Sequence, residues 1–279
     1  RPALPILIDG LRRLEYRGYD SAGVAILDGG EVAVRRSVGK IADLEKFIGP
    51  AGVPGTLGIG HTRWAPHGRP SEQNAHPHRS GPFVVVHNGI IENYLALKKR
   101  LQGRGYAFSS ETDTEVVAVL LNSHYRSGDA GRALAKTLAE IEGSYALGVL
   151  CVEEPGCLFA ARQGSPLVIG RGVGEQFLAS DVPALIAHTR EVIYLENGEV
   201  AALSCDGVKL TDSAGKARRV KSCHVSWDPV SAERGGYKHF MLKEIHEQPT
   251  ACLDTFRTRV SQEKGRVILD DAVGLTPKV

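Results

Sequence analysis

The most distinctive stretch of this sequence is HTRWAPHGRPSEQNAHPH, which occupies residues 61–78. Its apolar residues recur with a period of neither 2 nor 3.6, so the pattern predicts a loop, entered from a short strand near residues 56–60. The stretch contains a tryptophan and four of the ten histidines of the chain. Loops of this length are uncommon in compact domains unless they are functional or disordered, and this composition favours a loop that holds a polar ligand.

Regular periodicity surrounds this stretch on both sides, and it predicts an α+β layered domain with antiparallel sheets. The apolar spacing predicts helices at 3–16, 41–48, 93–102, 114–125 and 130–141. Asp28-Gly29-Gly30 predicts a hairpin between strands at 24–27 and 31–38, and a buried strand follows at 83–87. The second half contains short strands, predicted at 144–152, 157–162, 167–170, 176–179, 192–195 and 199–203.

Turn and linker residues complete this outline. Asn197-Gly198 separates the last two of these strands, and because Asn-Gly is a strong hairpin signal, we expect the two to pair. Glu233-Arg234-Gly235-Gly236 is typical of a linker, and a helix is predicted over 239–260 with an interruption near Pro249. We therefore predict one domain over residues 1–230 and a separate segment over 231–279.

The bulk composition excludes several classes of protein. The 279 residues are 42% apolar and 24% charged, and a net charge of +2 without a basic stripe argues against nucleic-acid binding. No run approaches the roughly 20 apolar residues of a membrane span, and the first ten residues lack a signal-peptide pattern. Five scattered cysteines, an odd number, fit free thiols in a reducing cytoplasm, which is the location that we expect.

Five motifs in one order resemble a known enzyme family. The run HTRWA-x-HG-x-PS-x-x-NAHPH resembles the glutamine loop of glutamine–fructose-6-phosphate aminotransferases, which make glucosamine 6-phosphate. Four further motifs agree, and they are LEYRGYDSAG (14–23), VHNGIIEN (86–93), ETDTE (111–115) and KEIHEQP (243–249). The resemblance spans nearly the whole chain.

The resemblance implies a fold and an activity that periodicity alone does not give. The fold is a four-layer αββα sandwich of the N-terminal nucleophile hydrolase type, forming a class II glutamine amidotransferase domain. Residues 231–279 would be the linker and the truncated start of an α/β sugar isomerase domain. The implied substrate is L-glutamine and no cofactor is implied. The implied partners are C-terminal isomerase domains that bind fructose 6-phosphate, and we expect the full-length protein to be a homodimer.

The implied nucleophile is an N-terminal cysteine whose own α-amino group serves as the base, because that amine titrates near pH 7.7–8.0. By the family pattern this cysteine precedes Arg1 by about nine residues. The five cysteines in the sequence all lie in mid-chain and lack a free amine. We therefore expect the chain as written to be unable to hydrolyse glutamine.

Two charged residues are candidates for holding the substrate. Arg63 offers a planar guanidinium that matches a carboxylate in two hydrogen bonds, although it has the alternative of being an ordinary surface arginine. Asp113 would bind the α-ammonium group, but Thr112-Asp113-Thr114-Glu115 also opens a helix, where an aspartate often serves as the N-cap. The two roles of Asp113 are compatible.

Asn88 and Gly89 are the candidates for the oxyanion hole, since Asn offers a side-chain N–H and Gly an unobstructed backbone N–H. The alternative is a tight Asn-Gly turn. Trp64 is the candidate lid over bound glutamine, with ordinary packing as its alternative. Arg17 and Gly18 are expected to support the N-terminus.

Histidines are frequent around the loop, but their spacing fits no compact zinc pattern, so we predict no metal site. We expect His67 and His76 to order the loop and contact the ligand. Pro66 stands where the family usually has Thr, which removes a hydroxyl and a backbone donor. Two alternatives to the proposed enzyme remain, namely another class II amidotransferase and a non-catalytic glutamine-binding regulatory module.

Overall fold

The computed structural model describes residues 1–18, 20–63 and 70–226, and in the remainder residues 237, 239, 241–246, 248–249, 260–261 and 266–267. Contacts divide the chain into two units, Arg1–Ser226 and Trp227–Val279. The first unit contains the sheets and helices that form the candidate site.

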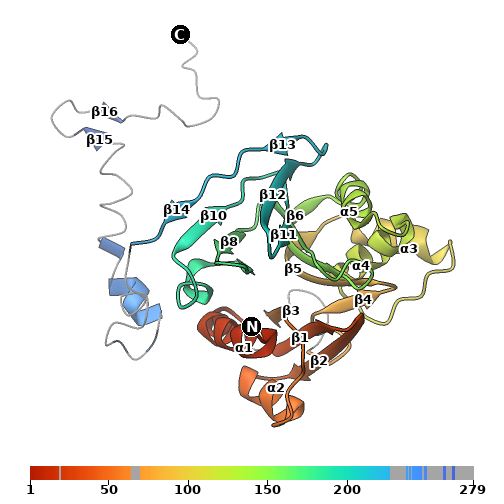
Figure 1. The fold of residues 1–279 in the computed structure, drawn as a ribbon, viewed down its shortest axis with the longest axis horizontal. Helices are drawn as coiled ribbons and strands as arrows, with labels where there is room; N and C mark the ends of the chain where they lie inside the picture. Colours follow the sequence, from red (N-terminus) through yellow and green to blue (C-terminus); the bar gives the residue numbers. More distant parts are fainter. Residues whose placement is uncertain are drawn as a thin grey trace. The chain divides into compact units, whose positions relative to one another are not determined.

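Two facing β layers form the middle of the first unit (Figure 1). One layer is a seven-stranded sheet in the order β13-β12-β11-β7-β6-β5-β4, and the other consists of a three-stranded sheet, β2-β1-β3, and a four-stranded sheet, β14-β10-β8-β9. All pairings are antiparallel. The strands are β1 (Ser21–Asp28), β2 (Glu31–Val38), β3 (Leu57–Arg63), β4 (His78–Ser80), β5 (Phe83–Ile91), β6 (Gly143–Cys151), β7 (Leu158–Gln163), β8 (Val168–Arg171), β9 (Gln176–Ala179), β10 (Glu191–Tyr194), β11 (Glu199–Ser204), β12 (Gly207–Asp212), β13 (Ala217–Arg218) and β14 (Cys223–His224).

Helices cover the outer face of each β layer. On one side lie α1 (Ala3–Leu14), which continues into the 3-10 turn η1 (Glu15–Arg17), α2 (Ile41–Ile48) and the 3-10 turn η2 (Val182–Ala184). On the other side lie α3 (Tyr94–Gln102), α4 (Asp113–His124) and α5 (Ala130–Leu138). This order confirms the expected αββα sandwich.

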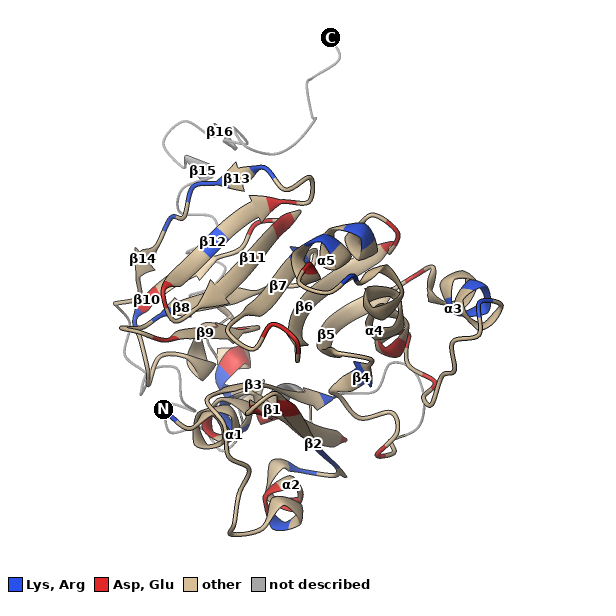
Figure 2. Cartoon of the chain, turned by 45° about the vertical axis from the view of Figure 1, so that its right-hand side comes forward, with Lys and Arg blue, Asp and Glu red and all other residues tan. Residues whose placement is uncertain are grey.

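Alternation along the strands produces the layers, because successive side chains point to opposite faces of a sheet. In β1, Val24 packs with α1 and α2, whereas Ala25 packs between the sheets. In β5, Val85 packs under α4, whereas Val84 faces the opposite sheet. Fully burying one such aliphatic side chain contributes roughly 1.5–3 kcal/mol. Figure 2 shows charged residues on the helices and at hairpin ends.

Most predicted elements are present, but several boundaries and one pairing differ. The loop predicted at 61–78 begins inside β3 and ends in β4, and β5 extends past His87 to Ile91. The helix predicted to 141 ends at Leu138, and the short strands β12, β13 and β14 were not predicted.

The hairpin predicted at Asn197-Gly198 is wrong. β10 pairs with β8 and β14, whereas β11 pairs with β7 and β12, so the turn carries the chain from one β layer to the other. The Asn197 side-chain oxygen accepts a hydrogen bond from the backbone N–H of Gly164 at 2.8 Å, which ties this crossing to the end of β7.

The second unit is described only in parts. Residues 241–246 and 248–249 are helical, and the rings of Tyr237 and His246 stack at 5.2 Å. The helix predicted to 260 does not reach that residue, because β15 (Val260–Ser261) pairs with β16 (Arg266–Val267). The predicted linker at 233–236 lies outside the described residues. In the described part of the chain, no helix combines the length and apolarity that crossing a bilayer requires.

Candidate active site

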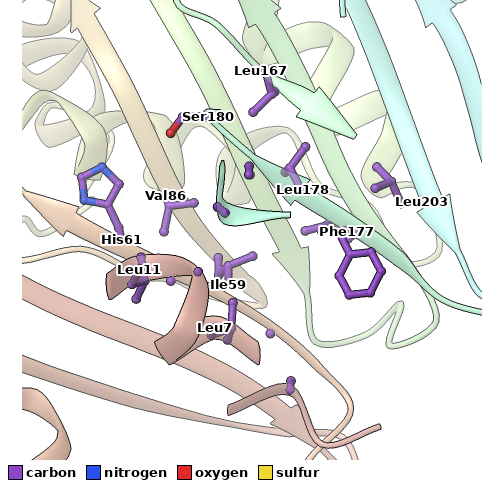
Figure 3. A pocket seen from close by; sticks show the side chains of 18 of the residues that line it. Leu7, Leu11, Ile59, His61, Val86, Leu167, Phe177, Leu178, Ser180 and Leu203 are labelled. Carbon is purple, nitrogen blue, oxygen red and sulfur yellow. The ribbon is translucent and has the colours of Figure 1, made fainter. Parts of the chain in front are cut away.

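A cleft of about 860 Å³ lies in the β layer that consists of the three-stranded and the four-stranded sheet, and β3 and β9 line it. Among the described strands, β3 pairs only with β1 and β9 only with β8, so each has an edge without a strand partner. α1 also lines the cleft, together with Leu167 just before β8 and with Val86 and Ala146 from the seven-stranded sheet. Figure 3 shows His61 and Ser180 at one end, and Phe177 and Leu203 at the other.

Strand alternation explains why polar residues gather at one end of this cleft. Ile59 packs between the two sheets, so His61 and Arg63, two and four residues further along β3, share its face. In β5, Val86 and Asn88 likewise share the face toward the opposite sheet. The inner faces of both strands are therefore apolar along the cleft and become polar at one end, at His61 and Arg63 on β3 and at Asn88 on β5.

Arg63 is the last residue of β3 and is only 3% exposed. Its backbone carbonyl accepts a hydrogen bond from the N–H of Asp20 at 3.1 Å, which fixes the end of the strand. Burial lowers the pKa of the guanidinium, while the charges of Asp20 and Asp113 raise it. Arg63 is therefore a buried cation that lines the cleft, suited to pairing with an anionic group of a ligand.

Asp113 begins α4 but does not cap it. The cap is Thr112, whose hydroxyl accepts a hydrogen bond from the backbone N–H of Glu115 at 3.3 Å. One oxygen of the buried Asp113 carboxylate accepts a hydrogen bond from the N–H of Ile91 at 2.9 Å. The N-cap alternative for Asp113 is therefore wrong, and its carboxylate lines the cleft that Arg63 also lines.

Asn88 and Gly89 lie inside β5, opposite Ala146 and Tyr145 of β6, so the alternative of an Asn-Gly turn is also wrong. Gly89 has a φ of +131°, and a Cβ at this position would lie 2.1 Å from the carbonyl oxygen of Ser144. Only glycine fits this close approach. Both residues line the cleft, where a side-chain amide and a backbone N–H are available to a developing negative charge.

Three buried histidines, His76, His78 and His87, and the half-buried His61 surround this end of the cleft, and their lowered pKa values keep all four neutral. Burial lowers the pKa of His61 to about 4 and that of His78 to about 3, and it lowers the pKa values of His76 and His87 as well. His76 Nε2 lies 2.8 Å from the hydroxyl of Thr114, and the His76 ring lies 4.3 Å from that of His61. His76 lines the cleft, as expected of a ligand contact.

No group of three or more His, Cys, Asp and Glu side chains in the described ranges is arranged to hold a metal ion. The four histidines around the cleft bond instead to Thr, Asn and backbone groups. They act as neutral hydrogen-bonding groups that fix the residues around them.

Two predicted site residues, Trp64 and His67, lie outside the described residues, as does Pro66. Arg17 belongs to η1 and its side chain is not described. Gly18 is extended and donates its N–H to the carbonyl of Glu15 at 3.1 Å, and it is not among the described residues that line the cleft.

Sequence reasoning missed the roles of His61 and Thr114. His61 was considered only as a metal ligand, and Thr114 only as part of a helix start. The signal for His61 was the alternation Ile59, His61, Arg63, which the prediction of a loop from residue 61 concealed.

Comparison with known proteins agrees with this geometry. Residues 61–187 match the family described as a glutamine amidotransferase domain. The chain is 52% identical over 273 residues to the glutamine–fructose-6-phosphate aminotransferase [isomerizing] of Caldanaerobacter subterraneus subsp. tengcongensis, covering 97% of this chain and 45% of that protein. It is 53% identical over 280 residues to the protein of the same name from Symbiobacterium thermophilum, covering 99% and 45%.

Solved structures show the same fold. Glutamine phosphoribosylpyrophosphate amidotransferase from B. subtilis, complexed with ADP and GMP, matches with a TM-score of 0.65 and 27% identity, over 77% of this chain and 48% of that one. A glutamine aminotransferase class-II domain protein from Silicibacter pomeroyi matches with a TM-score of 0.51 and 18% identity, over 70% and 96%.

The chain spans about 45% of the length of the two curated relatives. The similarity to them covers nearly all of this chain, and the family match includes the end of β3, all of β5 and α4, and the residues of the polar end of the cleft. The chain therefore belongs to the glutamine–fructose-6-phosphate aminotransferase family and carries its class II glutamine amidotransferase domain.

Proposed function

We propose that this chain is the glutamine-hydrolysing half of a glucosamine-6-phosphate synthase. It would release ammonia from L-glutamine for transfer to fructose 6-phosphate, giving glutamate and glucosamine 6-phosphate. The observation that carries the proposal is the convergence of Arg63, Asp113, Asn88 and Gly89 on one end of one cleft. These residues come from β3, α4 and β5, and all four line the cleft.

Arg63 and Asp113 fit the two charged ends of an α-amino acid. The guanidinium would pair with the substrate carboxylate and the Asp113 carboxylate with the substrate ammonium. Both side chains are buried, so the interactions would form away from water and be stronger than surface pairs. The side-chain amide of glutamine would then extend toward Asn88 and Gly89.

The nucleophile of the proposed reaction is a cysteine thiol, which the family resemblance places ahead of Arg1. We propose that it is carried by an extended segment between β3 and β9, whose facing edges offer backbone N–H and C=O groups to an inserted strand. Of the described cysteines, only Cys205 lines the cleft, two residues after Leu203 at the apolar end.

In the proposed reaction the thiolate adds to the amide carbon of glutamine. The resulting oxyanion accepts hydrogen bonds from the Gly89 N–H and the Asn88 side-chain amide, each of which is worth roughly 3–4 kcal/mol if it resembles known oxyanion-hole donors. The α-ammonium group of the cysteine gives its proton to the leaving nitrogen, ammonia departs and a thioester remains. Water then cleaves the thioester to glutamate and restores the thiol.

The test measures ammonia release and L-glutamine binding by the full-length protein. Asp113→Ala should raise the KM for glutamine about 10- to 100-fold, because a hydrogen bond to a charged group contributes about 1.5–3 kcal/mol. The far-ultraviolet circular dichroism should not change. Asp28→Ala at the exposed β1–β2 turn is the matched control and should leave the KM unchanged. An unchanged KM in Asp113→Ala would remove that residue from the site, and binding without ammonia release would favour a regulatory module.

We further propose that residues 231–279 are the linker and the start of the sugar isomerase part, which would bind fructose 6-phosphate. We expect a cytoplasmic homodimer when the protein is full length. Light scattering of the purified protein at micromolar concentration tests the oligomeric state, and a monomer would contradict it.

A further inference from the structure

We propose that His61 is a positioning residue that orients the side-chain amide of Asn88, so that its N–H₂ end faces the reacting carbonyl of the substrate. The inference rests on the proposed function, since it concerns the oxyanion donor of that reaction. His61 Nε2 lies 2.8 Å from Asn88 Oδ1, and the two residues come from different sheets that meet at the polar end of the cleft.

The orientation of an asparagine amide decides whether it stabilises or repels an oxyanion. Its Nδ2 donates hydrogen bonds and its Oδ1 only accepts them, so a reversed amide would place an acceptor against the developing charge. A donor on Oδ1 removes this ambiguity. The Nε2–H of His61 is that donor, because a carbonyl oxygen accepts and the ring nitrogen must then carry the proton.

Hydrogen bonds through the Thr114 hydroxyl also fix which ring nitrogens of the neighbouring His87 and His76 carry a proton. His87 Nε2 lies 3.3 Å from the carbonyl of Ser144, so it carries a proton, and the other ring nitrogen of the neutral ring accepts from the Thr114 hydroxyl at 3.1 Å. The Thr114 oxygen is then free to accept from His76 Nε2 at 2.8 Å. His76 in turn packs its ring against that of His61.

Burial makes the arrangement rigid and keeps His61 neutral. His61 lies on the inner face of β3 beside His87 and Arg63, both of which disfavour a second proton on its ring. A neutral ring carries one N–H, and the contact with Asn88 assigns it to Nε2. The orientation of Asn88 is therefore set before any substrate arrives, as electrostatic preorganisation requires.

The test compares two His61 variants of the full-length enzyme with one control variant. His61→Leu removes the donor and should lower the kcat for ammonia release about 10- to 100-fold, at most the loss of a whole oxyanion donor, with the KM changed less than about twofold. His61→Gln keeps an N–H in nearly the place of Nε2 and should retain kcat within about fivefold of the wild type. His124→Leu removes a half-buried histidine bonded to Glu140, away from the cleft, and is the matched control.

A double-mutant cycle separates positioning from a general structural role. In an Asn88→Ala background, His61→Leu should cause no further loss of kcat, because the residue that it orients is gone. A further loss of about the same factor as in the wild type would overturn the proposal. If the wild type releases ammonia and Asn88→Ala is impaired while His61→Leu is not, this inference fails and the proposed function stands.

A spectroscopic measurement keeps the inference testable if His61→Leu does not fold. The ring nitrogen chemical shifts of the ¹⁵N-histidine-labelled protein, assigned by comparison with His61→Gln, distinguish the two neutral tautomers. We expect the Nε2–H tautomer at pH 7. The Nδ1–H tautomer would overturn the proposal, because its Nε2 cannot donate to Asn88.

Discussion

Substitution of Gly89 tests how closely β5, the strand that carries the proposed oxyanion donors, packs against β6. In Gly89→Ala, the new Cβ would lie 2.1 Å from the carbonyl oxygen of Ser144 in the neighbouring strand β6. Both partners are backbone in the middle of the seven-stranded sheet, so no side chain can rotate away. The substituted residue would also keep a φ of +131°, a conformation that L-residues rarely adopt.

The expected loss of folding stability in Gly89→Ala is the sum of the costs of the backbone conformation and of the close contact. The backbone conformation costs roughly 1–3 kcal/mol, and separating two packed strands costs roughly another 1–3 kcal/mol. The sum is about 2–6 kcal/mol of a total stability of about 5–15 kcal/mol. At about 2–4 °C per kcal/mol for a domain of this size, the Tm should fall by roughly 4–24 °C.

The control isolates the close approach from the backbone conformation. Gly30 has a φ of +88° and no neighbour within 4 Å of an added Cβ, so Gly30→Ala incurs only the conformational cost. Differential scanning calorimetry of both variants gives the difference directly. If Gly89→Ala is no less stable than Gly30→Ala, the close contact between β5 and β6 is refuted.

Two further predictions concern buried ionisable groups. The carboxylate of Glu115 accepts hydrogen bonds from the N–H and the hydroxyl of both Ser109 and Ser110 at 2.7–2.8 Å. Glu115→Gln turns an N–H₂ group toward these donors and should lower the free energy of unfolding, measured in urea, by roughly 1–3 kcal/mol. A Glu115→Gln variant of wild-type stability would contradict this network. His61 and His78 have folded pKa values of about 4 and about 3, below the usual 6.5, so the unfolded chain takes up protons first as the pH falls. The stability that the two neutral rings contribute is complete above pH 6.5 and should be lost at about 1.4 kcal/mol per pH unit for each ring between pH 6 and 4. His78→Gln should reduce the slope of stability against pH. Urea unfolding midpoints that stay constant from pH 7 to 5 would contradict this prediction.

Local apolar patterns predicted most elements, both where one face is apolar and in central strands such as β1 and β6 that are buried on both faces. The failures came where a local signal met a requirement set by distant residues. Asn197-Gly198 has the sequence of a hairpin turn, yet β10 and β11 belong to different sheets, and nothing within the turn specifies which strand lies beside it. Asn88-Gly89 has the same composition and lies within a strand, because β6 pairs with it on one side.

The candidate site was predicted in composition more fully than in arrangement. Arg63, Asp113, Asn88 and Gly89 line one cleft, but the sequence left the helix cap as an alternative role for Asp113, and Thr112 provides that cap. The difference matters for function, because the carboxylate of a capping aspartate would accept hydrogen bonds from the N–H groups at the start of the helix. With Thr112 as the cap, one oxygen of Asp113 is held by the N–H of Ile91 on β5. This bond, together with that between Thr114 and His87, ties α4 to the strand that carries Asn88 and Gly89.

The position of the polar groups follows from the sandwich itself. Residues on the inner faces of two packed sheets are normally apolar, and a buried polar group destabilises the fold unless it is hydrogen-bonded. At one end of the cleft, His61 and Arg63 on β3 and Asn88 on β5 replace aliphatic residues at such inner positions. The contact between His61 and Asn88 offsets part of this cost and at the same time fixes the direction of the amide. The hydrogen bond that makes the buried polar end tolerable is therefore the one that prepares it for an oxyanion, so a variant that loses it should become both less stable and slower.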